Sequence, residues 1–112
     1  MAIINFEEIL KGLKYDINKQ IVENTLKEIG YSVKDSPYGI DAKKFKGTSR
    51  IHFIIEVHGN GNIYKDSEIR LHEDVYIGPL HPTRIQSKRI TEEIRLFKKE
   101  LKRQIKKQQE LK

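Results

Sequence analysis

The sequence predicts an α+β fold: a small antiparallel sheet of three to four strands, an N-terminal helical region and a long C-terminal helix. Apolar residues recur at helical spacing over 6–29, alternate with polar residues over 50–58, and form a second helical stripe over 90–105. The expected order is α-β-(β)-β-β-α, with the bracketed strand optional. Both helices should bury their apolar stripes on one face of the sheet.

The N-terminal helical region has identifiable start and stop signals. Asn5 is a candidate N-cap, with Glu7 and Glu8 in the first turn, where the helix dipole favours anions. Asp16 would cap a second segment, so one bent helix and two helices both remain open. Gly30 is the expected C-cap. The predicted core positions are Phe6, Ile9, Leu10, Leu13, Ile21, Val22, Thr25, Leu26 and Ile29.

The strands follow this region. Short strands are expected over 31–34 and 38–42, separated by a turn at 35–37. The basic segment 43–46 then leads into a loop over 47–49. The clearest strand covers 50–58, with Ile51, Phe53, Ile55 and Val57 on one face. A return strand is expected from 62 through 72, and the same alternation extends to 77. Lys65 would face inward in this strand, so a bulge or turn at 65–67 stays an alternative.

The hairpin between these two strands contains Gly59-Asn60-Gly61. A two-residue turn would point Ile69 and Leu71 outward, whereas a three-residue loop keeps the apolar residues together. We therefore expect the three-residue loop, with His52 opposite Glu68. A phosphate-binding glycine loop should open a helix, and this one opens a strand, so we assign these glycines a backbone role.

The outer face of this hairpin is polar and is a candidate surface for a partner. His52 and His58 are six residues apart on one strand, about 20 Å by strand rise, which is too far to share a metal ion. We predict no metal site, although one histidine with a residue from a neighbouring strand stays an alternative. The residues of this face are His52, Glu56, His58, Glu68, Arg70 and His72.

The C-terminal helix carries the excess positive charge. Residues 84–112 contain 11 Lys or Arg and 4 acids, a balance of +7, against −1 for residues 1–83. Ser87 or Thr91 is the expected cap, the apolar stripe is Ile90, Ile94, Phe97, Leu101 and Ile105, and residues 106–112 should fray. Such an asymmetry favours a nucleic acid or an acidic protein as partner. The candidate nucleic-acid-binding residues are Lys88, Arg89, Arg95, Lys98, Lys99, Lys102, Arg103 and Lys106.

The order of a helix, strands and a last helix entered by Ser87-Lys88-Arg89 resembles a double-stranded-RNA-binding domain. The resemblance implies that Lys88 and Arg89 contact phosphates. It covers only the element order and this tripeptide. The last helix lacks the alanine-rich face of that family, the first helical region is long, and a further strand is expected.

The length and the amino-acid composition limit the classes of protein to consider. The chain has 112 residues, 37% hydrophobic and 34% charged, which predicts a single domain over 1–112 with a thin core. It has no Cys, which excludes disulfides, thiolate metal sites and a Cys nucleophile. No apolar run approaches the roughly 18–20 residues of a membrane span, and the N-terminus has no signal-peptide pattern. We expect a cytoplasmic protein, in a cell or an infected host, without a cofactor or a membrane partner.

The sequence therefore predicts a small non-enzymatic binding protein that contacts nucleic acid through its C-terminal helix, with help from Lys43, Lys44 and Lys46. The composition would suit a phage or mobile-element protein. One alternative is a protein-binding inhibitor or assembly factor that uses the outer sheet face, and a homodimer through the helices is a further option. A second alternative is a small hydrolase or nuclease centred on four residues, namely His52, Glu56, Glu68 and His72.

Overall fold

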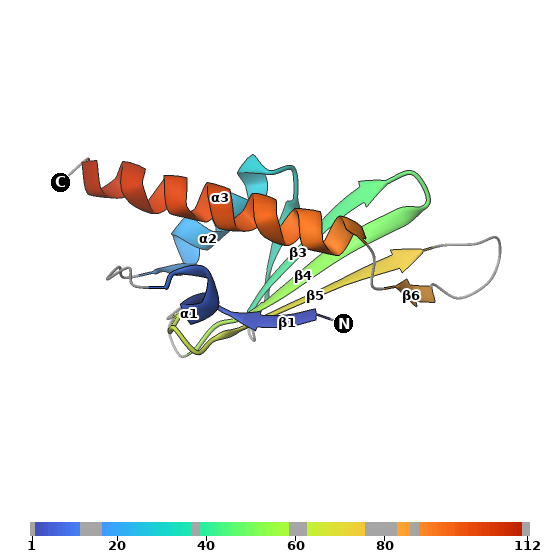
Figure 1. Ribbon diagram of the computed structural model, residues 1–112, viewed down its shortest axis with the longest axis horizontal. Coiled ribbons are helices and arrows are strands. Elements are labelled where there is room, and N and C mark those ends of the chain that lie inside the picture. Colours follow the sequence, from blue (N-terminus) through green and yellow to red (C-terminus); the bar gives the residue numbers. More distant parts are fainter. Residues whose placement is uncertain are drawn as a thin grey trace.

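The computed structural model describes residues 2–11, 17–36, 39–58, 63–75, 83–85 and 88–110 (Figure 1). The helices are α1 (Phe6–Ile9), α2 (Lys19–Glu28) and α3 (Lys88–Glu110). The strands are β1 (Ala2–Asn5), β2 (Ser32–Ser36), β3 (Gly39–Lys46), β4 (Ser49–Glu56), β5 (Glu68–Val75) and β6 (Thr83–Ile85).

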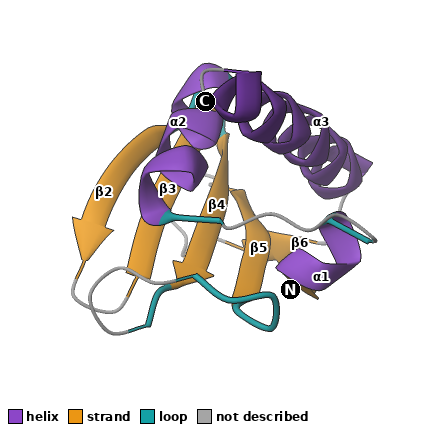
Figure 2. Cartoon of the chain, turned by 90° about the vertical axis from the view of Figure 1, so that its left-hand side faces the viewer, coloured by secondary structure: helices purple, strands orange, loops and turns teal. Residues whose placement is uncertain are grey.

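All strand pairs are antiparallel, and the sheet has the order β1-β5-β4-β3-β2, with β6 also paired to β5. Figure 2 shows α2 and α3 together on one face of this sheet. We call this the helix face and the opposite one the open face. The predicted α+β class and the shared face for both helices are confirmed. The predicted three to four strands and their order are not exact, because the sheet has six strands within the described residues, five in one row and β6 beside β5.

The core lies between the helix face and the two longer helices. Three aromatic rings meet at its centre: Phe53 lies 5.0 Å from Tyr31, edge to face, and 5.3 Å from Phe97. Apolar residues of every long element surround them, which is why a chain with few hydrophobic residues still closes one core. The residues with no more than 1% exposure include Phe6, Val22, Leu26, Ile40, Ala42, Ile51, Phe53, Ile55, Ile69, Leu71, Phe97 and Leu101.

The N-terminus begins with a strand that the sequence did not predict. Residues 2–5 pair with β5, and Asn5 then caps α1 by accepting a hydrogen bond from the Glu8 backbone N–H (3.0 Å), as predicted. A separate helix α2 follows, capped by Asn18, whose side chain accepts from the Ile21 N–H (2.9 Å). The predicted cap Asp16 lies outside the described residues. Gly30 follows α2 at φ +98°, which confirms the predicted C-terminal signal.

The strand β3 is longer than the predicted 38–42, because it continues through the basic segment 43–46. Its partner β4 starts at Ser49, so the turn between them is only Gly47-Thr48, with Gly47 at φ +60°. The strand β2 likewise continues through Ser36, where a turn was expected, and residues 37–38 lie outside the described residues. Alternation of faces along β3 puts Lys43 on the open face and Lys44 on the helix face.

The register of the β4–β5 hairpin differs from the predicted one. Phe53 lies opposite Leu71, four residues further along the chain than predicted. His52 consequently lies opposite His72 and not opposite Glu68. Because the displacement is an even number of residues, every side chain of the hairpin strands keeps its predicted face.

The connection before β5 explains this displacement. Ser67 donates its backbone N–H to the Tyr64 carbonyl (3.0 Å), and its hydroxyl accepts from the Tyr64 N–H (2.9 Å). Ser67 and Ile63 are both buried, so 63–67 forms a packed turn. The alternative of a turn at 65–67 therefore describes this segment better than a continuous strand from 62. The predicted glycine loop itself falls within 59–62, outside the described residues.

The helix α3 confirms the predicted stripe. Ile90, Phe97, Leu101 and Ile105 are buried, and Ile94 is partly buried against the core. The helix starts at Lys88, so Thr91 lies inside it and is not its cap, whereas Ser87 lies outside the described residues. The helix continues to Glu110, and the fraying of 106–112 stays a prediction. Among the described helices, none combines the length and the apolar character needed to cross a membrane.

Candidate functional site

The side of α3 that faces the sheet contains a buried ion-pair network. The Glu93 carboxylate accepts hydrogen bonds from the Tyr31 hydroxyl (2.7 Å) and from the Lys44 ammonium (2.8 Å). The Lys44 nitrogen also lies 5.1 Å from the centre of the Tyr31 ring. Burial, followed by the hydrogen bond to Glu93, raises the pKa of Tyr31 well above its usual value, so the hydroxyl remains a donor.

Arg89 makes a second connection between α3 and the sheet. Its guanidinium donates to the Ser49 hydroxyl and to the Glu73 carboxylate (3.0 Å), and Glu73 is 4% exposed. Two predicted nucleic-acid contacts, Arg89 and Lys44, therefore hold α3 on the sheet. Lys43 lies on the open face, across the sheet from α3, and the side chain of Lys46 is not described.

The remaining acids of α3 within the described structure are mostly engaged by neighbouring arginines. Glu92 pairs with Arg95, and their hydrogen bonds lower the pKa of Glu92 and raise that of Arg95. Burial alone would raise the pKa of Glu100, but hydrogen bonds from Arg103 and Gln104 outweigh it and lower that pKa. Arg103 also lies 4.0 Å from Glu28 of α2. The pairs formed within α3 have the spacings of three and four residues expected on a helix surface.

The solvent side of α3 carries a row of exposed cations opposite the apolar stripe. Its spacings of seven, four, three and four residues keep the side chains on one side of the helix, over about 27 Å at 1.5 Å per residue. Within the described part of the chain, none of its lysines forms an ion pair, and neither do Lys98 and Lys107 at its flanks. This set, the cationic row, comprises Lys88, Arg95, Lys99, Lys102 and Lys106.

A polar groove lies next to the C-terminal end of the cationic row, between α2 and α3. It has Ile21 and Lys107 in its wall, and its other lining residues are amides that can both donate and accept hydrogen bonds. The amide residues are Asn18, Gln20, Asn24, Gln104 and Gln108.

On the open face, the structure places the predicted residues in separate pairs. Glu68 binds Arg70 (3.1 Å), and Glu56 binds His58, whose ring lies 5.3 Å from the Tyr64 ring. Together with Ile54, three of these residues line a shallow hollow, namely Glu56, Glu68 and Arg70. The open face also exposes Ile3, Phe45 and Ile54, by 55%, 68% and 38%.

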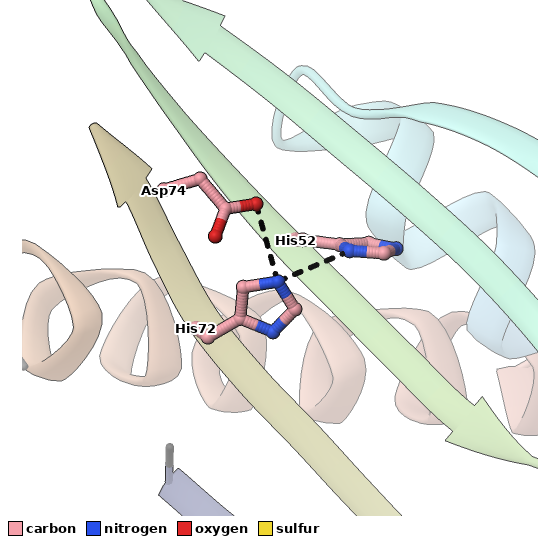
Figure 3. Close-up of side chains that lie close together, drawn as sticks. All are labelled: His52, His72 and Asp74. Carbon is pink, nitrogen blue, oxygen red and sulfur yellow. Dashed lines mark hydrogen bonds and ion pairs between the residues drawn. The ribbon is translucent and has the colours of Figure 1, made fainter. Parts of the chain in front are cut away.

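A tighter cluster on the open face was not predicted from the sequence. His52 Nδ1 lies 3.3 Å from His72 Nε2, which in turn lies 3.3 Å from Asp74 Oδ2 (Figure 3). The other ring nitrogen of His52 lies 2.8 Å from the Asp41 carboxylate, and Arg50 pairs with Asp74. His72 and Asp74 are only 3% and 4% exposed. The signal that could have found the cluster is the strand register, because it alone decides what lies opposite His52.

The four residues of the hydrolase alternative do not form one cluster. His52 and His72 lie opposite each other, but Glu56 is four residues further along β4 than His52, about 13 Å by strand rise. Glu68 stands at the same distance from His72 along β5. The structure therefore brings together two of the four proposed catalytic residues.

The chain matches no protein-family model, and it shows no significant similarity to any curated protein or solved structure. The element-order resemblance to double-stranded-RNA-binding domains is not supported by these comparisons. The function proposed below therefore depends on the geometry and charge of this chain alone.

Proposed function

We propose that this protein binds nucleic acid through the sugar-phosphate backbone, using the cationic row of α3. The observation that carries the proposal is the row of exposed cations whose lysines have no carboxylate partner within the described structure. Neutralising phosphates with such side chains releases condensed counterions, which supplies affinity without reading sequence.

A merely solvated helix face would be expected to mix charges of both signs. On α3, Glu93 points toward the sheet, Glu92 is held by Arg95 of the row, and Glu100 is held by Arg103 at its flank. Arg95 is the member of the row that pairs with an acid, Glu92, and the charges of its four lysines have no ion-pair partner within the described residues. The amide-lined groove beside Lys107 supports the same proposal, because amides donate hydrogen bonds to phosphate and sugar oxygens.

The proposal is tested by measuring binding of the full chain to a generic DNA duplex, an RNA duplex and a single strand by fluorescence anisotropy over a salt series. If four phosphates are neutralised, the slope of log K against log salt on duplex DNA is about −3.6, from about −0.9 per contact. Dissociation constants at physiological salt should lie at roughly 10⁻⁴–10⁻⁶ M and depend little on sequence. Absence of saturable binding to all three at low salt would contradict the proposal.

A second candidate function is the binding of a protein partner on the open face. The observation that favours it is the exposure of Ile3, Phe45 and Ile54 on a face that no described helix covers. Capture from the source organism with the wild type and with Phe45→Asp as baits tests it. A protein retained by the wild type and lost from the variant is the expected result, and identical captured sets would contradict it.

A further inference from the structure

The cluster on the open face lies across the sheet from the cationic row, so a ligand could bind there whether or not α3 binds nucleic acid. The antiparallel register puts His52 of β4 directly opposite His72 of β5, and Asp74 follows two residues later on the same face. Three potential metal ligands therefore converge from two paired strands of regular geometry. Their ligand atoms all lie within 4.8 Å of one another.

We propose that His52, His72 and Asp74 bind one divalent transition-metal ion of the zinc type, with a fourth position open to water or another ligand. Two atoms bound at about 2.0–2.1 Å to a tetrahedral ion are about 3.3 Å apart. His52 Nδ1 and His72 Nε2 are 3.3 Å apart, and so are His72 Nε2 and Asp74 Oδ2. These three atoms thus already have two of the three separations that a tetrahedral site requires.

Asp41 prepares His52 for this role. The Asp41 carboxylate lies 2.8 Å from His52 Nε2 and can only accept a hydrogen bond. In the neutral ring Nε2 therefore carries the hydrogen and donates a hydrogen bond to Asp41. The lone pair is then on Nδ1. Figure 3 shows that this nitrogen is the one turned toward the His72 ring. A carboxylate that accepts from the outer nitrogen of a ligating histidine is the usual support of a metal site. Asp41 would act as a positioning residue and not as a ligand.

The cluster has charges of both signs around it, and the ligand types indicate which ion it would select. Asp41 and Asp74 supply two negative charges. Arg50 supplies a positive charge and donates to the same Asp74 Oδ2 that faces His72, so a bound ion would have to share this oxygen with Arg50 or displace it. Lys43, opposite His52 on the same face, supplies a second positive charge. Two imidazoles and one carboxylate favour zinc, copper or nickel over magnesium and calcium, which prefer oxygen ligands. The His52 side chain is 11% exposed, so the cluster is largely withdrawn from water but is reached through His52.

The test uses untagged full-length protein that has been treated with a chelator and dialysed. Zn²⁺ alone is titrated by calorimetry, and Co²⁺ alone is followed by visible absorption, which is strong when cobalt is tetrahedral. We expect saturation at one equivalent. His52→Ala should abolish this binding. Asp41→Asn should weaken it about tenfold, the effect of losing a supporting carboxylate. His58→Ala is the matched control and should bind as the wild type does, because His58 pairs with Glu56 away from the cluster.

Folding is checked by circular dichroism for each variant, and addition of Zn²⁺ should raise the melting temperature of the wild type and of His58→Ala but not of His52→Ala. Both His52→Ala and Asp41→Asn change residues that are partly exposed, so at least one is expected to fold. Absence of saturable binding by the wild type would overturn the proposal. The contact between His52 and His72 would then be a hydrogen bond between the two rings and no metal site. Binding that His52→Ala leaves intact would also overturn the proposal.

Discussion

The two sides of α3 differ in what their charged residues do. On the side toward the sheet, Glu93 and Arg89 form hydrogen-bonded ion pairs with residues from distant parts of the chain. On the solvent side, the lysines of the cationic row have no such partner within the described structure. The net charge of a helix therefore overstates the charge that a ligand can contact, because some of its charged side chains hold the helix on the rest of the protein.

This difference makes stability and binding separable. Changes on the inner side of α3 should lower the free energy of unfolding, and changes in the cationic row should lower nucleic-acid affinity without altering stability. The predictions below run from the largest expected effect on stability to the smallest.

The largest effect is expected for Phe97→Ala. The ring is fully buried and packs 5.3 Å from that of Phe53, so its removal leaves a cavity under the sheet. The free energy of unfolding, measured by urea denaturation, should fall by about 3–5 kcal/mol. Lys99→Ala, half a turn away on the solvent side, is the control and should leave the urea midpoint in place. A similar loss of unfolding free energy in both variants would contradict the assignment of stability to the inner side of α3.

The next effect is expected for Glu93→Gln, which removes the charge that Lys44 and Tyr31 share. Because the Glu93 side chain is 11% exposed and that of Lys44 is 26% exposed, the loss is smaller than for a fully buried pair. We expect the free energy of unfolding to fall by about 2 kcal/mol. The neighbouring acid Glu92 provides the control, since Glu92→Gln changes the same charge on the exposed side. An equal shift of the urea midpoint in both variants would contradict the buried role of Glu93.

A smaller effect with a distinctive pH dependence is expected for Tyr31→Phe. Loss of its hydrogen bond to Glu93 should cost about 1 kcal/mol near neutral pH. The pKa of Tyr31 is raised in the folded state, so above about pH 10 the unfolded chain loses the tyrosine proton first and wild-type stability falls. The variant lacks this loss, and the difference in stability between the two proteins should shrink from about pH 9 to pH 11. A stability difference that stays constant from about pH 9 to pH 11 would contradict the raised pKa of the Tyr31 hydroxyl.

The sequence predicted the elements with a clear period and missed the short ones. The apolar stripe of α3 and the faces of β4 and β5 follow from spacing alone. The strand β1 has only four residues and β6 three, too few for a period to be recognised. The strand predicted over 38–42 alternates only weakly and ends before the basic segment 43–46, which belongs to β3. The Lys44 charge is neutralised by Glu93, 49 residues away in sequence, and nothing local indicates this.

The site residues illustrate the same limit. The excess charge of α3 was visible in the sequence, but the engagement of Arg89 by Glu73 depends on the tertiary structure. The histidine cluster was missed because the connection between the two strands was taken to be a three-residue glycine loop. A buried turn around Ser67 lengthens the connection and moves His72 opposite His52. Register errors of this kind keep the face of each residue and change its neighbour.

The most direct test of the central claim compares two triple variants with the same net charge. In the first, Lys99, Lys102 and Lys106 of the cationic row are changed to Gln. In the second, three exposed lysines elsewhere are changed to Gln, namely Lys27, Lys34 and Lys65. The measurement is the salt dependence of binding to a DNA duplex. The account predicts a slope about 2.7 less steep for the first variant alone, at about 0.9 per lost phosphate contact, with the urea midpoints of both variants near that of the wild type. Equal slopes in the two variants would contradict it.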